Sequence, residues 1–131
     1  MKKKLILLAA ATLLLFGCNA AMVVNGRVVG IQSGKAIYQD GYLTIRYKAD
    51  IDPVWQACEK AVADLKGWSI EKERKISTGS IKAIISDEKV TIGVEYIDKD
   101  MVSVSVLTGV SGNNIASGMI HDRIAANLAA R

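Results

Sequence analysis

The chain has 131 residues, half of them hydrophobic, and a formal net charge of +4. This length suits one domain of moderate size. Lys2, Lys3 and Lys4 supply three of the four net positive charges, so the charge gives no indication of nucleic-acid binding, which requires a basic face on the folded part.

Residues 1–17 have the composition of a secretory signal peptide. The basic segment 1–4 is followed by 12 consecutive apolar residues, Leu5 to Phe16. A membrane-spanning helix requires roughly 20 apolar residues, so this run is short for a span. Counting onward to Val24 gives a longer stretch interrupted mainly by Asn19, and an uncleaved N-terminal anchor therefore stays open as an alternative.

The segment Leu15-Phe16-Gly17-Cys18 resembles the lipobox of bacterial lipoproteins. The resemblance implies cleavage before Cys18, a diacylglyceryl group on its thiol and acylation of its new amino group. Phe16 departs from the pattern, which usually has a small or β-branched residue there. Two or three acyl chains anchor a small domain almost permanently, because each buried CH₂ contributes about 0.8 kcal/mol. Asn19, where inner-membrane lipoproteins of enteric type carry aspartate, implies the outer membrane, with the domain facing the periplasm.

Cysteine chemistry is limited in this chain, because Cys18 and Cys58 are its two cysteines. A lipidated Cys18 leaves Cys58 without an intramolecular disulfide partner. Cys58 falls within an apolar helical stripe, which predicts a packed core cysteine rather than a reactive one. The spacing of His, Cys, Asp and Glu does not match a zinc site, and we expect no cofactor and no metal.

Residues 18–40 are expected to form the lipidated N-terminus and a tether to the domain. Within this segment Asn25-Gly26 lies between pairs of valines, which is typical of a β-hairpin. The surrounding glycines and polar residues fit a loose linker equally well. We expect the globular domain to span residues 41–131, starting at Gly41.

The domain is predicted to open with a half-buried strand and an amphipathic helix. Apolar and polar residues alternate over 43–48, and Asp52 and Pro53 then suit the cap and first position of a helix. Gly67 suits its C-terminal end. The expected apolar stripe of this helix consists of Val54, Cys58, Ala61, Val62 and Leu65.

From Trp68 onward the hydrophobic period changes to two, which predicts four strands joined by short turns. A closing helix follows the glycine-containing loop 109–114, with His121 and Asp122 on its solvated flank. Its expected apolar stripe consists of Ile115, Ala116, Met119, Ile120, Ile124 and Leu128. The chain is therefore predicted to form a two-layer α+β domain of order β-α-β-β-β-β-α, an antiparallel meander sheet with two helices packed on one face.

The pattern as a whole resembles a family of small bacterial lipoproteins catalogued as a domain of unknown function. The resemblance rests on the lipobox, on turn glycines and strand valines, and on the start of the first helix. It implies no activity, cofactor or catalytic residue. The segments that carry it are Gly41-Tyr42-Leu43, Asp52 to Ala57, Gly79 to Ala83, Val90-Thr91-Ile92, Val102-Ser103-Val104 and the loop from Gly109 to Asn113.

Three functions are compatible with these features. The favoured one is a non-enzymatic envelope module, anchored in the membrane, that docks on another envelope protein. The alternative is a periplasmic domain that binds an apolar ligand between sheet and helices. An enzyme is the least favoured, because Cys58 with His121 and Asp122 would be its candidate constellation, and neighbouring helical side chains diverge.

Overall fold

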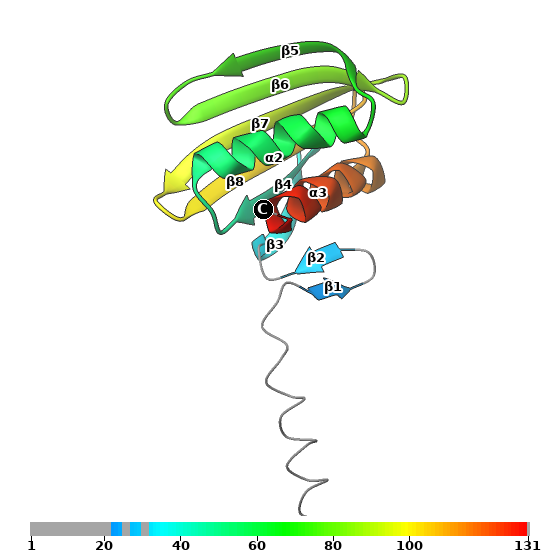
Figure 1. The fold of residues 1–131 in the computed structure, drawn as a ribbon. Coiled ribbons are helices and arrows are strands. Elements are labelled where there is room, and N and C mark those ends of the chain that lie inside the picture. The colour runs from blue at the N-terminus through cyan, green and yellow to red at the C-terminus, as the bar shows by residue number, and fades with distance from the viewer. Residues whose placement is uncertain (1–21, 25–26, 30–31, 131) are drawn as a thin grey trace, which may run out of the picture.

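The computed structural model describes residues 22–24, 27–29 and 32–130, with side chains from Ala36 onward. In this part of the chain a six-stranded antiparallel sheet carries two helices on one face (Figure 1). The predicted α+β class and the element order β-α-β-β-β-β-α are confirmed. That core order consists of β4 (Tyr42–Tyr47), α2 (Ile51–Asp64), β5 (Trp68–Arg74), β6 (Thr78–Ile85), β7 (Glu88–Asp98), β8 (Met101–Thr108) and α3 (Asn114–Ala129).

The strand order across the sheet is β3-β4-β8-β7-β6-β5. Strands β5 to β8 form the expected meander, in which each strand pairs with the next. Helix α2 connects β4 to β5 at the far edge of the sheet. The strands β5 to β8 then run back across the sheet, and β8 pairs with β4. Ile45 of β4 lies opposite Val104 of β8, and β8 and β7 form the middle of the sheet.

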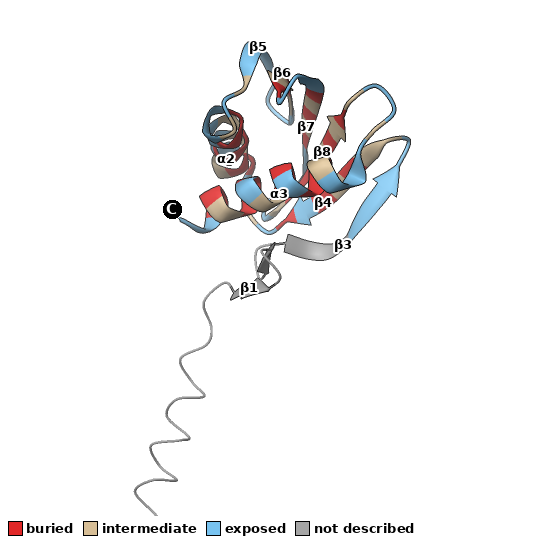
Figure 2. Ribbon diagram, turned by 90° about the vertical axis from the view of Figure 1, so that its right-hand side faces the viewer, coloured by how far each residue is buried: buried red, intermediate tan, exposed pale blue. Residues whose placement is uncertain are grey.

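The core lies between the sheet and the two helices, and Figure 2 shows the buried residues where these layers face each other. Successive side chains of a strand point to opposite faces, so alternate residues of each strand reach this core. They are Leu43, Ile45 and Tyr47; Ile81, Ala83 and Ile85; Val90, Ile92 and Val94; Val102, Val104 and Val106. The alternation of β7 also predicts Tyr96 on this face, but its side chain is 40% exposed.

Helix α2 begins earlier than the sequence suggested. Its N-cap is Asp50, whose carboxylate accepts a hydrogen bond from the backbone N–H of Ile51, so the prediction of Asp52 as the cap is wrong. Pro53 is tolerated at the third helical position because the first N–H groups of a helix have no intrahelical acceptor. At the other end Lys66, not glycine, adopts positive φ, and Gly67 packs closely against Val62.

The sheet extends upstream of the expected domain start at Gly41. Strand β3 (Gln32–Gln39) pairs with β4 and forms one edge of the sheet, so part of the expected tether 18–40 belongs to the fold. Before it, β1 (Met22–Val24) pairs with β2 (Arg27–Val29), as the hairpin alternative predicted. Asn25 and Gly26 themselves lie outside the described residues.

Helix α3 buries a different face from the one predicted. Ile120, Ile124 and Leu128 are buried as expected, but Ile115 and Met119 are exposed. The buried face instead includes polar and small residues that a hydrophobicity pattern does not count as core: Ser117, Gly118, His121, Ala125 and Asn127.

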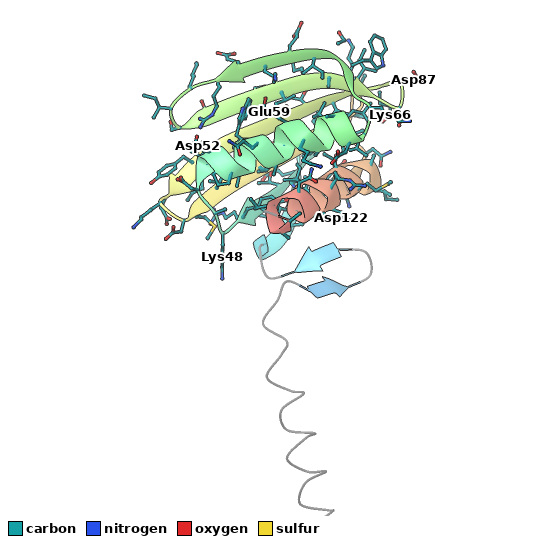
Figure 3. The ribbon with its side chains drawn as sticks, in the orientation of Figure 1. Lys48, Asp52, Glu59, Lys66, Asp87 and Asp122 are labelled. Carbon is teal, nitrogen blue, oxygen red and sulfur yellow. The ribbon has the colours of Figure 1, made fainter. Side chains whose placement is uncertain are left out.

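Side chains of α2 also contact β5, the edge strand opposite β3. Arg74 forms an ion pair with Asp52, with 2.6 Å between Nη2 and Oδ1, and its guanidinium lies 5.7 Å from the centre of the Trp55 ring. Lys72 pairs with Glu59 at 2.8 Å. Asp52 and Glu59 are both labelled on α2 in Figure 3. Exposed ion pairs of this kind contribute about 0–1 kcal/mol each, and a cation–π contact at an exposed site contributes a similar amount.

The Trp55 ring rests on Gly79 of β6, and this close approach yields a stability prediction. A Cβ atom at position 79 would lie 2.4 Å from Cζ3 of Trp55, so Gly79→Val must displace the ring. We expect destabilisation of about 1–3 kcal/mol, measured as the free energy of unfolding in urea. Gly93→Val is the matched control, because a Cβ there meets no atom within 4 Å. Equal destabilisation by the two variants would contradict the role given to Trp55.

Candidate functional site

Cys18, the residue that the sequence singles out most strongly, lies outside the described residues. The other candidates, Cys58, His121 and Asp122, lie on the two helices. The geometry therefore tests the interior candidates, and the lipidation of Cys18 stays a prediction.

Cys58 is a core residue, as predicted. Its side chain is fully buried on the inner face of α2, and its thiol is free of any disulfide. Burial raises the pKa of the thiol far above its ordinary value, and the neighbouring carboxylate of Glu59 adds to the shift. Because the thiolate is the nucleophilic form of cysteine, this environment suppresses reactivity.

His121 is fully buried, so the expectation of a solvated surface histidine is wrong. Its Nε2 lies 2.7 Å from the carbonyl oxygen of Leu43, and its Nδ1 lies 2.8 Å from the hydroxyl of Tyr47. A carbonyl oxygen only accepts, so Nε2 carries the proton and donates it. In the neutral ring Nδ1 is then an acceptor for the Tyr47 hydroxyl, which also lies within donating distance, 3.3 Å, of the backbone carbonyl oxygen of His121. Both ring nitrogens are thus used to join α3 to β4.

Two further buried polar contacts lie along the inner face of α3. The hydroxyls of Thr108 and Ser117 lie 3.0 Å apart and join the end of β8 to the second turn of the helix. The side-chain amide of Asn127 donates to the carbonyl oxygen of Ala57 on α2, at 3.4 Å. Sequence reasoning missed these residues. The signal that could have found them is their spacing, because Ser117, His121 and Asn127 share the stripe of Ile120 and Ile124.

The buried polar side chains of α3, Ser117, His121 and Asn127, form hydrogen bonds within the domain. A general base needs a ring nitrogen within reach of a substrate, whereas the two nitrogens of His121 are occupied by the domain's own backbone and by Tyr47. Asp122 is half-buried at the next helical position, about 100° around the helix from His121. In the part of the chain that the structure describes, no three His, Cys, Asp or Glu residues are grouped to hold a metal ion.

The outer face of the sheet, opposite the helices, is the other candidate site. Thr44 of β4 and Ser105 of β8 lie on this face near the β3 edge, with 2.7 Å between their hydroxyl oxygens. They line an open hollow of about 560 Å³ at the edge of the sheet formed by β3 and β4, together with Ile37, Gln39, Asp40 and Tyr42. A broad hollow that mixes hydroxyl and apolar side chains suits contact with another surface.

Taken together, these features define a small two-layer α+β domain. Buried hydrogen bonds join α3 to the sheet and to α2 in its interior, and the outer face of the sheet is open. The chain belongs to the family described as "Protein of unknown function (DUF3568)", whose model matches residues 3–127. This match confirms the domain-of-unknown-function part of the resemblance. No curated protein matches the chain. Among the described residues, neither helix combines the length and apolar character needed to cross a membrane.

The buried hydrogen bonds of His121 to Leu43 and Tyr47 lead to a prediction about stability. Because His121→Leu removes the buried hydrogen bonds of the ring to the Leu43 carbonyl and to the Tyr47 hydroxyl, we expect it to cost about 1–3 kcal/mol of unfolding free energy. Tyr47→Phe removes one of these groups and should cost about 1–2 kcal/mol. In a double-mutant cycle with urea unfolding, the two costs should not add, because both remove the same bond. Strict additivity would show that the two side chains do not interact.

Burial of Cys58 makes a reactivity prediction. In the folded protein an aqueous thiol reagent should leave Cys58 unmodified, and in urea the same reagent should label it at once. Peptide mass mapping reads position 58 separately from position 18. As the control, Met119→Cys places a thiol on the exposed side of α3 and should react in the folded state. Rapid labelling of Cys58 without urea would contradict the core assignment.

Proposed function

We propose that the protein is a lipoprotein of the bacterial cell envelope, cleaved after Gly17 and acylated at Cys18. The observation that carries the proposal is the sequence of the first 18 residues: three lysines, an apolar run too short for a span, and a glycine directly before a cysteine. Asn19 favours the outer membrane, with the domain facing the periplasm. The acyl chains on Cys18 then supply the membrane attachment.

The domain itself acts in this proposal as a non-enzymatic accessory module that docks on another envelope protein. Support comes from the interior, where Cys58 is buried as a thiol and His121 is held by Tyr47 and Leu43. The Cys58 thiol and the His121 ring, which are the candidate nucleophile and base, are therefore packed and hydrogen-bonded inside the domain. The outer sheet face, with Thr44 and Ser105 in the hollow near its β3 edge, remains available for a partner.

The alternative of an apolar ligand between sheet and helices has less support. Core side chains from the strands and from both helices occupy that space, among them Ile92, Val104 and Ile124, each with no exposed surface. The hollow on the outer face is open and lined partly by hydroxyl groups, which suits a protein surface better than an apolar molecule.

The anchor is tested by metabolic labelling. Radiolabelled palmitate should enter the wild-type protein and not Cys18→Ala, because the thioether and the new amino group both belong to Cys18. Cys58→Ala is the matched control and should stay labelled, since the buried thiol is not an acceptor. If wild type and Cys18→Ala are both unlabelled and the N-terminus is intact, the first segment is an ordinary anchor and the proposal fails.

A further inference from the structure

An apolar surface surrounds the start of α3. Ile115 and Met119 lie one helical turn apart and are 79% and 64% exposed, and Val110 in the preceding loop is 98% exposed. Tyr38 of β3 lies beside the loop between Val110 and Ile115, because a Cβ atom added at Gly112 would lie 2.7 Å from its hydroxyl oxygen. We name these four residues, Tyr38, Val110, Ile115 and Met119, the α3 patch.

The α3 patch lies in an uncharged part of the chain. No Asp, Glu, Lys or Arg occurs from Met101 to His121, the stretch that contains three of its four residues, and the patch is bordered one helical turn after Met119 by one charge of each sign, Asp122 and Arg123. A group of exposed apolar side chains rimmed by polar and charged residues is characteristic of a contact surface. The lack of charge also indicates that the contact is not electrostatic.

The N-terminal hairpin lies on the same side of α3 as the patch. Strand β2 lies against α3 (Figure 1), and Asp122 lies on the side of α3 that faces β2 (Figure 3). Residues 115, 119 and 122 share one side of a helix, since they are four and three positions apart. The exposed Ile115 and Met119 therefore belong to the side of the domain from which the chain leads back to Cys18.

The length of chain between the anchor and this hairpin is short. Four Cα–Cα steps join Cys18 to Met22, a reach of at most about 15 Å. Met22 pairs with Val29 at the far end of the hairpin, and β2 lies against α3, so Cys18 stays within about 35 Å of the helix. A fully extended tether over 18–40 would have allowed about 80 Å.

From these observations we propose that the α3 patch sits in the headgroup region of the bilayer that holds the acyl chains of Cys18. The inference rests on the proposed lipid anchor and adds an orientation: the domain lies on the membrane by its α3 side. Tyrosine and apolar side chains suit this interface, and an uncharged patch fits zwitterionic phospholipid. The anchor keeps the patch at high local concentration near the lipid, so a weak contact suffices. The outer sheet face is then left for a partner.

The experiment places a fluorescent label on the lipidated protein in vesicles of phosphatidylethanolamine and phosphatidylglycerol. Met119→Cys carries an environment-sensitive nitrobenzoxadiazole label, and the label is specific because Cys58 is buried and Cys18 is blocked by lipid. Ile76→Cys is the matched control: position 76 is 97% exposed and lies in the turn between β5 and β6, at the opposite edge of the sheet from β3.

We expect the label at position 119 to shift to the blue and to be quenched several-fold less by aqueous iodide when the protein sits on vesicles. Lipids with a quencher near the headgroup should quench it, and added salt should have little effect. The label at position 76 should remain accessible to iodide. Introducing Ile115→Asp into the Met119→Cys protein should restore iodide quenching, because a carboxylate opposes burial in lipid.

Three results would overturn the proposal. Equal iodide quenching at positions 119 and 76, with the protein floating with the vesicles, rejects the membrane contact and leaves the anchor intact. Shielding at position 119 that fades as protein is diluted on the vesicles indicates a second copy of the chain as the occupant. Failure of the wild-type protein to float removes the anchor itself, and with it both proposals.

Discussion

The hydrogen bonds of His121 to β4 are the constraint on which the arrangement of this domain depends. One imidazole ring donates to the Leu43 carbonyl and accepts from the Tyr47 hydroxyl, so a single α3 residue is joined to the strand at two points. Loss of the imidazole would remove both of these buried bonds, and the Tyr47 hydroxyl would keep its longer contact of 3.3 Å to the backbone carbonyl oxygen of residue 121. The contact therefore specifies the rotation of α3 about its axis as well as its attachment.

The rotation of α3 decides what the surface of the protein presents. With His121 inside, Ser117 meets Thr108 and Asn127 reaches Ala57, so polar side chains contact the sheet and the neighbouring helix. Ile115 and Met119 are consequently turned outward. The exposed apolar side of α3 is the direct result of a polar inner side, and it is the feature from which the orientation on the membrane is inferred.

The two faces of the domain have separate consequences for function. On the inner face, Cys58 is packed in the core and His121 is hydrogen-bonded to Tyr47. The outer face of the sheet has small hydroxyl side chains near its β3 edge, where Thr44 lies against Ser105. A module that is anchored on one side and presents a sheet face on another is suited to hold a partner at a membrane.

The sequence by itself determined the elements whose signal is local. Strict alternation predicted the inner residues of β4, β6, β7 and β8, because side chains on a strand alternate between its two faces, and the order of strands and helices followed from it. It also identified Cys58 as a core residue. Cys18 is a prediction of the sequence that the described residues leave untested.

Only the tertiary structure decided the features that depend on distant partners. The inward position of His121 requires Leu43 and Tyr47, which lie more than 70 residues away in the chain, and no local pattern reveals such acceptors. The pairing of β3 with β4 likewise depends on backbone hydrogen bonds that most sequences can form, so residues 32–39 carried little signal as a strand. Hydrophobic periodicity reports which residues avoid water, whereas hydrogen bonding in the core decides which polar residues join them.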